Sequence, residues 1–226
     1  MNVVPHGAVL DYLLHRPATA EDGTTVAVLL HGRGSNKADL QGLQPLLPES
    51  WVVVTPEAPF PASNWGYGGG SAWYRYLEED RVVAETLEES LAKLEQFLGE
   101  LPEILGFQPG RLILGGFSQG GTVSLAYALS RPGSVSAVLN FSGFLVASAE
   151  LDETGESPPT TPIFWGHGLG DPAIPISLAE VGRSRLRRAG ASLVARDYRI
   201  GHWIAAEEIE EAVLSLPSLP AAEAAS

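Results

Sequence analysis

Residues 111–121 read Arg-Leu-Ile-Leu-Gly-Gly-Phe-Ser-Gln-Gly-Gly, an apolar run that ends in a Gly-x-Ser-x-Gly motif centred on Ser118. The apolar stretch that follows, 122–129, reads as a helix. A strand, a sharp turn and a helix around this motif force the serine into a cramped backbone conformation and lift its hydroxyl above the sheet. Gly116 and Gly120 are expected where neighbouring chain passes too close for a side chain. The stretch therefore predicts a nucleophilic serine at the end of a strand.

A serine hydroxyl becomes a good nucleophile only beside a base that is oriented and balanced by an acid. The candidates occur along the chain in the order Ser118, Asp171, His202. Asp171 lies just past a predicted strand at 162–165, and His202 just past one that ends near Ile200. Catalytic groups of open α/β sheets lie beyond the carboxyl ends of strands. The order nucleophile, acid, base is the one that α/β-hydrolases use, so these three residues are the predicted catalytic set.

The remaining pattern predicts the same fold class. Continuous apolar runs indicate strands at 9–14, 26–30, 51–55, 112–115, 135–141, 162–165 and 193–198. Helices are expected over 80–101, 122–129, 176–189 and 205–214. Continuous rather than alternating apolar strands, interleaved with helices, favour a mostly parallel central sheet with helices on both faces. We expect an α/β-hydrolase fold without a large cap domain, one domain over 1–216, an irregular loop at 56–73 and a flexible tail at 217–226.

Composition excludes several classes of function. The chain has 226 residues, of which 45% are hydrophobic, and carries a net charge of −13. This acidity disfavours nucleic acid and anionic membrane surfaces as partners. No segment approaches the roughly 20 apolar residues that span a bilayer, so stable membrane insertion is not expected. The chain has no Cys, and its start lacks the features of a secretory leader. We therefore expect a cytoplasmic protein.

The oxyanion that forms during acyl transfer needs backbone donors. One is expected to be the N–H of Gln119, next to the nucleophile, and the other the N–H of Arg33 in the loop after residue 30. Aromatic side chains could line the acyl pocket or, equally, anchor a long loop to the core. The residues in question are Trp65, Tyr67, Trp73 and Tyr74, whereas Trp203, beside His202, could border the pocket or simply pack. Of these we predict Trp65, Tyr67, Trp73 and Trp203 as substrate-binding residues.

Some alternatives stay open at this point. Asp171 could instead cap a helix that starts near Pro172, because Asp favours that position. His31, His167 and His202 all follow strands and could in principle meet around a metal ion. No Cys or suitably spaced carboxylate accompanies them, so neither a metal nor a cofactor is expected.

An ordered set of motifs, spread over about residues 26–210, supports a family resemblance. The matching pieces are Leu30-His-Gly-Arg-Gly34, Pro56-Glu-Ala-Pro59, Ala72-Trp-Tyr74, Gly115-Gly-Phe-Ser-Gln-Gly-Gly121, His167-Gly-Leu-Gly-Asp171, and Gly201-His202 with Glu207-Glu208. The chain resembles the phospholipase/carboxylesterase family of α/β-hydrolases, which includes bacterial carboxylesterases and acyl-protein thioesterases. The family triad falls on Ser118, Asp171 and His202, and its oxyanion amides fall on Arg33 and Gln119.

The resemblance implies hydrolysis of short to medium acyl esters through an acyl-enzyme, without metal or organic cofactor. Thioesters and lysophospholipids are the nearest alternative substrates, and a homodimer is a further expectation because the family is often dimeric. The chain departs from the family at Arg33, where Leu is usual, and at Arg75, where Asp is common. These departures leave open a non-catalytic binding protein that kept the fold, although the intact triad counts against it.

Overall fold

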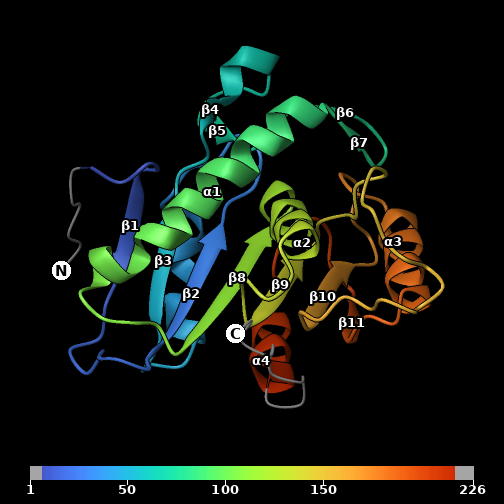
Figure 1. Ribbon diagram of the computed structural model, residues 1–226. Coiled ribbons are helices and arrows are strands. Elements are labelled where there is room, and N and C mark those ends of the chain that lie inside the picture. The colour runs from blue at the N-terminus through green and yellow to red at the C-terminus, as the bar shows by residue number, and fades with distance from the viewer. Residues whose placement is uncertain (1–6, 217–226) are drawn as a thin grey trace.

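The computed structural model describes residues 7–216 and contains a seven-stranded sheet of order β1-β3-β2-β8-β9-β10-β11 (Figure 1). Its strands are β1 (Tyr12–His15), β2 (Thr25–Leu30), β3 (Val52–Pro56), β8 (Arg111–Phe117), β9 (Ala137–Phe141), β10 (Ile163–Gly168) and β11 (Leu193–Tyr198). Edge strand β1 is antiparallel to β3, and every other neighbouring pair is parallel. The mostly parallel sheet predicted from the continuous apolar runs is confirmed.

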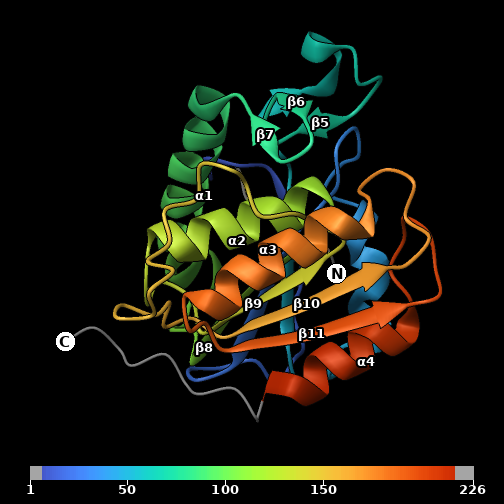
Figure 2. The same ribbon diagram turned by 90° about the vertical axis from the view of Figure 1, so that its right-hand side faces the viewer.

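Helices cover both faces of this sheet (Figures 1 and 2). The first face carries α1 (Ala84–Leu105), α2 (Gln119–Ser130) and α3 (Ile176–Arg188). The second face carries α4 (Ala206–Ser215) and a 3₁₀ helix, η1 (Asp39–Leu46), which the sequence analysis did not predict. The inner strands β2, β3, β8, β9 and β10 are largely buried on both sides, which explains why their sequences are apolar without alternation.

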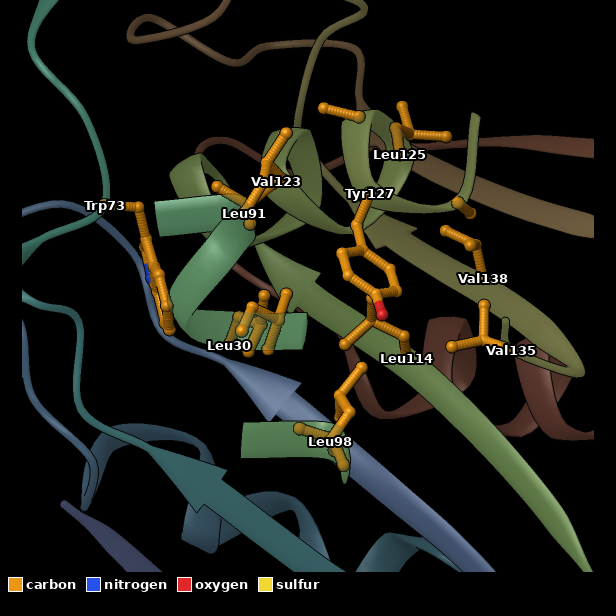
Figure 3. Close-up of a cluster of buried hydrophobic side chains, with 14 of the residues drawn as sticks. Leu30, Trp73, Leu91, Leu98, Leu114, Val123, Leu125, Tyr127, Val135 and Val138 are labelled. Atoms are coloured by element: carbon orange, nitrogen blue, oxygen red, sulfur yellow. The ribbon is translucent and has the colours of Figure 1, made fainter. Parts of the chain in front are cut away.

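Two hydrophobic cores result, one on each face. Along β2, Val28 and Leu30 point to the core under α1 and α2, whereas Ala27 and Leu29 point to the core under η1 and α4. Figure 3 shows part of the first core, where Leu30 and the neighbouring strands meet side chains of α1 and α2. Each such Leu or Val contributes roughly 1.5–3 kcal/mol by burial. The cores therefore fix the sheet on which the site is built.

The boundaries of α1 differ from the prediction. Residues 76–82 form a short hairpin, β6 (Tyr76–Glu78) and β7 (Arg81–Val82), turned by Glu79 at φ 51°. The helix therefore starts at Ala84 rather than at residue 80. At its other end it runs through Pro102, because buried Leu105 continues the apolar stripe, and it ends at Gly106 in the left-handed conformation.

The predicted irregular segment 56–73 contains short regular pieces. Strand β4 (Phe60–Pro61) pairs with β5 (Ser71–Ala72) and encloses a 3₁₀ turn, η2 (Ala62–Trp65). Figure 1 shows this excursion beyond the arrowheads of β2 and β8, above the carboxyl edge of the sheet. It therefore stands beside the edge where the predicted catalytic residues emerge. The predicted tail, 217–226, lies outside the described residues. Between residues 7 and 216 no helix combines the length and apolarity needed to cross a bilayer.

A buried acid on α4 predicts how stability depends on pH. The Glu208 carboxylate packs against Gly166 of β10 and accepts a hydrogen bond from the Ala205 amide, and burial raises its pKa from 4.5 to about 7. A raised pKa means that the acid stabilises the fold fully below pH 4.5 and that this contribution is lost as pH rises through about 7. We expect the free energy of unfolding of the wild type to fall, relative to Glu208→Gln, by about 1.4 kcal/mol from about pH 6 to about pH 8.5.

Urea unfolding at both pH values measures this difference. Glu207→Gln is the matched control, since it removes the same charge from an exposed neighbouring position. It should keep the wild-type pH dependence. An unchanged dependence in Glu208→Gln would show that the buried acid does not control stability in this range.

Candidate active site

Ser118 lies at the turn between β8 and α2 with its backbone at φ 55° and ψ −115°. A non-glycine residue in the left-handed region is strained, and the flanking glycines make the turn sterically feasible. A Cβ on Gly120 would overlap the carbonyl oxygen of Leu30, and one on Gly116 would overlap the backbone of Gly120. The close approach predicted for both glycines is confirmed. The tight packing holds the serine hydroxyl at the carboxyl edge of the sheet.

Ser118, His202 and Asp171 form one hydrogen-bonded line. His202 Nε2 lies 3.0 Å from Ser118 Oγ, and His202 Nδ1 lies 2.6 Å from Asp171 Oδ2. A carboxylate only accepts hydrogen bonds, so Nδ1 carries the ring proton and Nε2 is left to accept the serine proton. The side chains of His202 and Asp171 are 21% and 0% exposed, respectively. Three groups that are distant in sequence thus meet in the order that general-base activation of a serine requires.

The turn around Asp171 combines two arrangements that the sequence analysis treated as alternatives. Its Oδ1 accepts hydrogen bonds from the amides of Ala173 and Ile174, at 2.8 and 2.9 Å, as a capping aspartate does. Its Oδ2 is left for His202. The helix expected near Pro172 is absent from the described chain at that point, because α3 begins only at Ile176. The backbone amides orient the carboxylate toward the imidazole.

Both residues predicted to supply the oxyanion amides line the same cavity as Ser118. The cavity measures about 260 Å³, and Arg33 and Gln119 form part of its wall together with Ser118 and His202. Gln119 is the first residue of α2, so its N–H has no intrahelical acceptor. Within residues 7–216, the Arg33 N–H also makes no backbone hydrogen bond. Two backbone donors are therefore free beside the serine hydroxyl.

His31 orients one of these amides, a role that the sequence analysis did not assign. Its Nε2 accepts a hydrogen bond from the Ala58 amide at 3.0 Å, so the ring proton sits on Nδ1, which donates to the Gly32 carbonyl at 2.7 Å. The Gly32 carbonyl and the Arg33 N–H lie on opposite sides of one planar trans peptide. Fixing the carbonyl therefore fixes the direction of the Arg33 N–H. Burial lowers the pKa of His31, which keeps the ring neutral as this pairing requires.

His31→Phe should lower kcat for a neutral ester about tenfold or more with little change in KM, because removing a preorganised oxyanion donor costs up to about 10³-fold. His31→Asn retains a side-chain donor for the Gly32 carbonyl, so kcat should fall less in this variant than in His31→Phe. Steady-state kinetics on both variants, with circular dichroism as a check of folding, measures the effect. Equal losses in the two folded variants would show that the ring acts only by filling space.

The Gln119 side chain joins this site to the cavity wall. Its Oε1 accepts a hydrogen bond from the Trp73 amide at 3.0 Å, and its Nε2 donates to the Tyr74 carbonyl at 2.9 Å. The Trp73 indole N–H in turn donates to the His31 carbonyl at 3.0 Å. Residues 73–74 are therefore held against both oxyanion segments.

The aromatic wall of the cavity is not the one predicted. Its apolar and aromatic lining consists of Tyr74, Tyr76, Phe117, Phe144, Ala173 and Ile174. None of the four predicted substrate-binding residues lines the cavity. Trp73 is fully buried in the first core, beside Leu30 and Leu91 in Figure 3. Its indole N–H donates to the His31 carbonyl, and the ring does not contact the cavity.

The other three predicted residues lie around the site. The Trp65 ring packs between those of Phe60 and Tyr67, with centroids 5.0 and 5.9 Å away. The Tyr67 hydroxyl accepts a hydrogen bond from the Tyr76 amide at 2.8 Å, and its ring lies under the Arg33 guanidinium. Trp203 is 57% exposed and borders a separate, shallow depression that His202 also lines. The sequence pattern could not separate these positions from the wall, since all are aromatic and lie close in sequence to a glycine-rich loop or to the catalytic histidine.

The two remaining strand-end histidines serve the backbone. His167 Nε2 donates to the Ile174 carbonyl at 2.9 Å, which ties down the loop that carries Asp171, and burial lowers the pKa of His167. His31 is engaged as described above. Between residues 7 and 216 no group of three or more potential ligands is arranged to hold a metal ion.

A serine on a strained strand-to-helix turn above a parallel sheet, bonded to an imidazole from a later strand end, defines the class of α/β-hydrolases. The family model described as Phospholipase/Carboxylesterase matches residues 17–218. The chain belongs to this family, and it is a hydrolase that acts on ester bonds.

Individual relatives agree with this placement. Acyl-protein thioesterase 1 of Kluyveromyces lactis is 32% identical over 169 residues, which cover 70% of this chain and 74% of the relative. The crystal structure of esterase PE8 is 26% identical, with a TM-score of 0.74, and the match covers 97% of this chain and 99% of that one. A carboxylesterase from Mesorhizobium loti has the same fold at 18% identity, with a TM-score of 0.80 and coverage of 96% and 98%.

Proposed function

We propose that this chain is a serine carboxylesterase that cleaves short to medium acyl esters through an acyl-enzyme on Ser118. The observation that carries the proposal is the continuous line from Ser118 Oγ through both nitrogens of His202 to Asp171 Oδ2, at 3.0 and 2.6 Å. The line ends in a cavity with an aromatic wall, which suits an acyl chain.

The geometry supports the following sequence of steps. Ser118 Oγ attacks the ester carbonyl carbon while its proton passes to His202 Nε2, and Asp171 stabilises the imidazolium. The carbonyl oxygen becomes an oxyanion that accepts hydrogen bonds from the amides of Arg33 and Gln119. The intermediate collapses, the alcohol leaves with the proton from His202, and the acyl group remains on Ser118.

Deacylation repeats these steps with water in place of the serine. His202 Nε2 takes a proton from water, and the resulting hydroxide attacks the acyl carbonyl. The second tetrahedral intermediate collapses, the carboxylic acid departs, and the proton returns from His202 to Ser118 Oγ. No group outside the triad and the two amides is needed to balance this cycle.

Labelling and turnover together test the proposal. A fluorophosphonate probe should react at Ser118, located by mass spectrometry of the digested protein, and p-nitrophenyl esters from acetate to dodecanoate should be hydrolysed with a maximum at short to medium chains. Ligand binding without labelling at Ser118 would favour the rival reading of a non-catalytic binding protein.

A thioesterase is the second candidate, favoured by the 32% identity to an acyl-protein thioesterase. The same triad can expel a thiolate, because only the leaving group changes. Comparing kcat/KM for oxygen esters and thioesters of the same acyl chain separates the two functions, and lysophosphatidylcholine tests the phospholipid alternative. A clear preference for the thioester at equal chain length would replace the carboxylesterase assignment.

A further inference from the structure

Arg33 contributes more than its backbone to the cavity. This residue lines the wall together with Ser118 and His202, and its side chain is solvent-exposed. The proposed esterase chemistry uses the backbone amide of Arg33 and leaves its guanidinium without a role. Among the described residues that line the cavity, Arg33 is the only lysine or arginine.

Two tyrosines position the guanidinium. Its Cζ lies 4.7 Å from the ring centroid of Tyr67 and 6.0 Å from that of Tyr76. A cation over an aromatic face is attracted by the ring while the N–H donors at its edge stay free. The backbone amide of Tyr76 donates a hydrogen bond to the Tyr67 hydroxyl at 2.8 Å, which fixes the Tyr67 side chain against the Tyr76 segment. The positive charge is therefore held beside the cavity before any ligand arrives.

The loops that carry this arrangement are locked to each other. The Gly34 amide donates to the Ser71 carbonyl at 2.9 Å, and the Ser71 amide donates to the Ser35 carbonyl at 2.7 Å. A Cβ on Gly70 would overlap the backbone of Gly34 and Ser35, so the two loops are in direct contact. The Arg33 segment and the Tyr67 segment therefore move as one unit.

No internal partner satisfies the guanidinium. In the described part of the chain, the Arg33 side chain forms no hydrogen bond and no ion pair. Asp39 is the acidic residue on the same wall, and no ion pair joins it to Arg33. A fixed arginine whose donors are free suits the bidentate recognition of a carboxylate or phosphate.

We propose that the Arg33 guanidinium binds an anionic group of the substrate, so that the preferred substrate is an acyl ester carrying a carboxylate or phosphate near the scissile bond. This inference rests on the proposed esterase function of Ser118. The anion can belong to the acyl part, as in a half-ester of a dicarboxylic acid, or to the alcohol part, as in a phosphorylated alcohol. The shared chemistry is an anion within reach of the guanidinium.

Paired substrates test each source. For the acyl side, kcat/KM is compared for the mono-p-nitrophenyl ester of adipic acid and for its neutral methyl-capped form. For the alcohol side, it is compared for the butyryl ester of 4-hydroxyphenyl phosphate and for 4-hydroxyphenyl butyrate. At least one charged substrate should be preferred about tenfold at low salt, and the preference should shrink as salt is added.

Variants assign the preference to Arg33. Arg33→Gln should abolish the charged-to-neutral ratio, and Arg33→Lys should retain part of it. The ratio cancels any effect of the change on the oxyanion amide. Arg199→Gln is the matched control, because it removes the same charge from the separate depression that Trp203 borders, and Arg199 does not line the cavity. It should leave the ratio as in the wild type.

Failure of this inference differs from failure of the esterase proposal. Turnover of neutral esters with no preference in either pair, or a preference that survives in Arg33→Gln, overturns the role of Arg33 alone. Absence of all turnover overturns the esterase proposal. In that case the binding of the charged and the methyl-capped adipate esters to the Ser118→Ala protein is compared by calorimetry. Tighter binding of the charged ester, lost when Arg33→Gln is added, supports the anion site. Equal binding of the two esters overturns it.

Discussion

Ser118→Ala is expected to lower kcat/KM for p-nitrophenyl butyrate by about 10⁴- to 10⁶-fold while leaving the fold intact. The change removes the atom that forms the acyl-enzyme and leaves His202 Nε2 without its 3.0 Å partner. The oxyanion amides and the cavity remain, so only the residual rate typical of an intact site without its nucleophile should survive. Initial rates on purified protein measure the loss.

Ser124→Ala is the matched control for this experiment. It makes the same chemical change in α2, the helix that follows Ser118, where the Ser124 hydroxyl only donates to the Gly120 carbonyl at 2.8 Å. Its activity should stay within about threefold of the wild type, as expected for a substitution that makes no contact in the cavity. Wild-type rates in Ser118→Ala would remove the serine from the mechanism.

Asp171→Asn should lower kcat by about 10³- to 10⁴-fold. The Asn oxygen would keep the bonds to the amides of Ala173 and Ile174, so its NH₂ would face His202 Nδ1 as a donor. The ring would then carry its proton on Nε2, in the tautomer that cannot accept from Ser118. The imidazolium would also lose its counter-charge. A kcat measurement at near-neutral pH shows both effects together.

Asp152→Asn serves as the control for a loop aspartate that holds backbone amides. Asp152 accepts from the amides of Thr154 and Ser157, both at 3.0 Å, in an exposed loop remote from the cavity. Its rate should match the wild type within about twofold. Near-normal turnover in Asp171→Asn would mean that His202 needs no carboxylate and that the assigned triad is wrong.

The position of the three catalytic candidates was predictable because it depends on topology. Ser118, Asp171 and His202 each follow a strand, and parallel strands bring their carboxyl ends to one edge. The β1–β3 reversal and the extra 3₁₀ helix do not alter this edge. The strand runs in the sequence were therefore enough to place at one edge three residues that are far apart in the chain.

The cavity wall was not predictable, because it depends on contacts between loops. Trp73 and Tyr74 are adjacent, aromatic and fully buried, and both belong to the first core, yet only Tyr74 also lines the cavity. The Gln119 side chain sets this difference by hydrogen-bonding to the backbone of both residues, which lie at least 45 positions earlier in the sequence. No periodicity within the loop carries that information. Likewise, the neutral tautomer of His31 follows from the Ala58 amide, which is distant in sequence.

Gln119 couples the acyl-group specificity of this enzyme to its rate of turnover. Its amide is one of the proposed oxyanion donors, while its side chain holds the wall residue Tyr74. An enlarged or shifted wall would pull on the same residue that meets the developing charge. Broadening the range of accepted acyl groups at Tyr74 should therefore alter turnover along with affinity, and selectivity and speed would have to be re-tuned jointly.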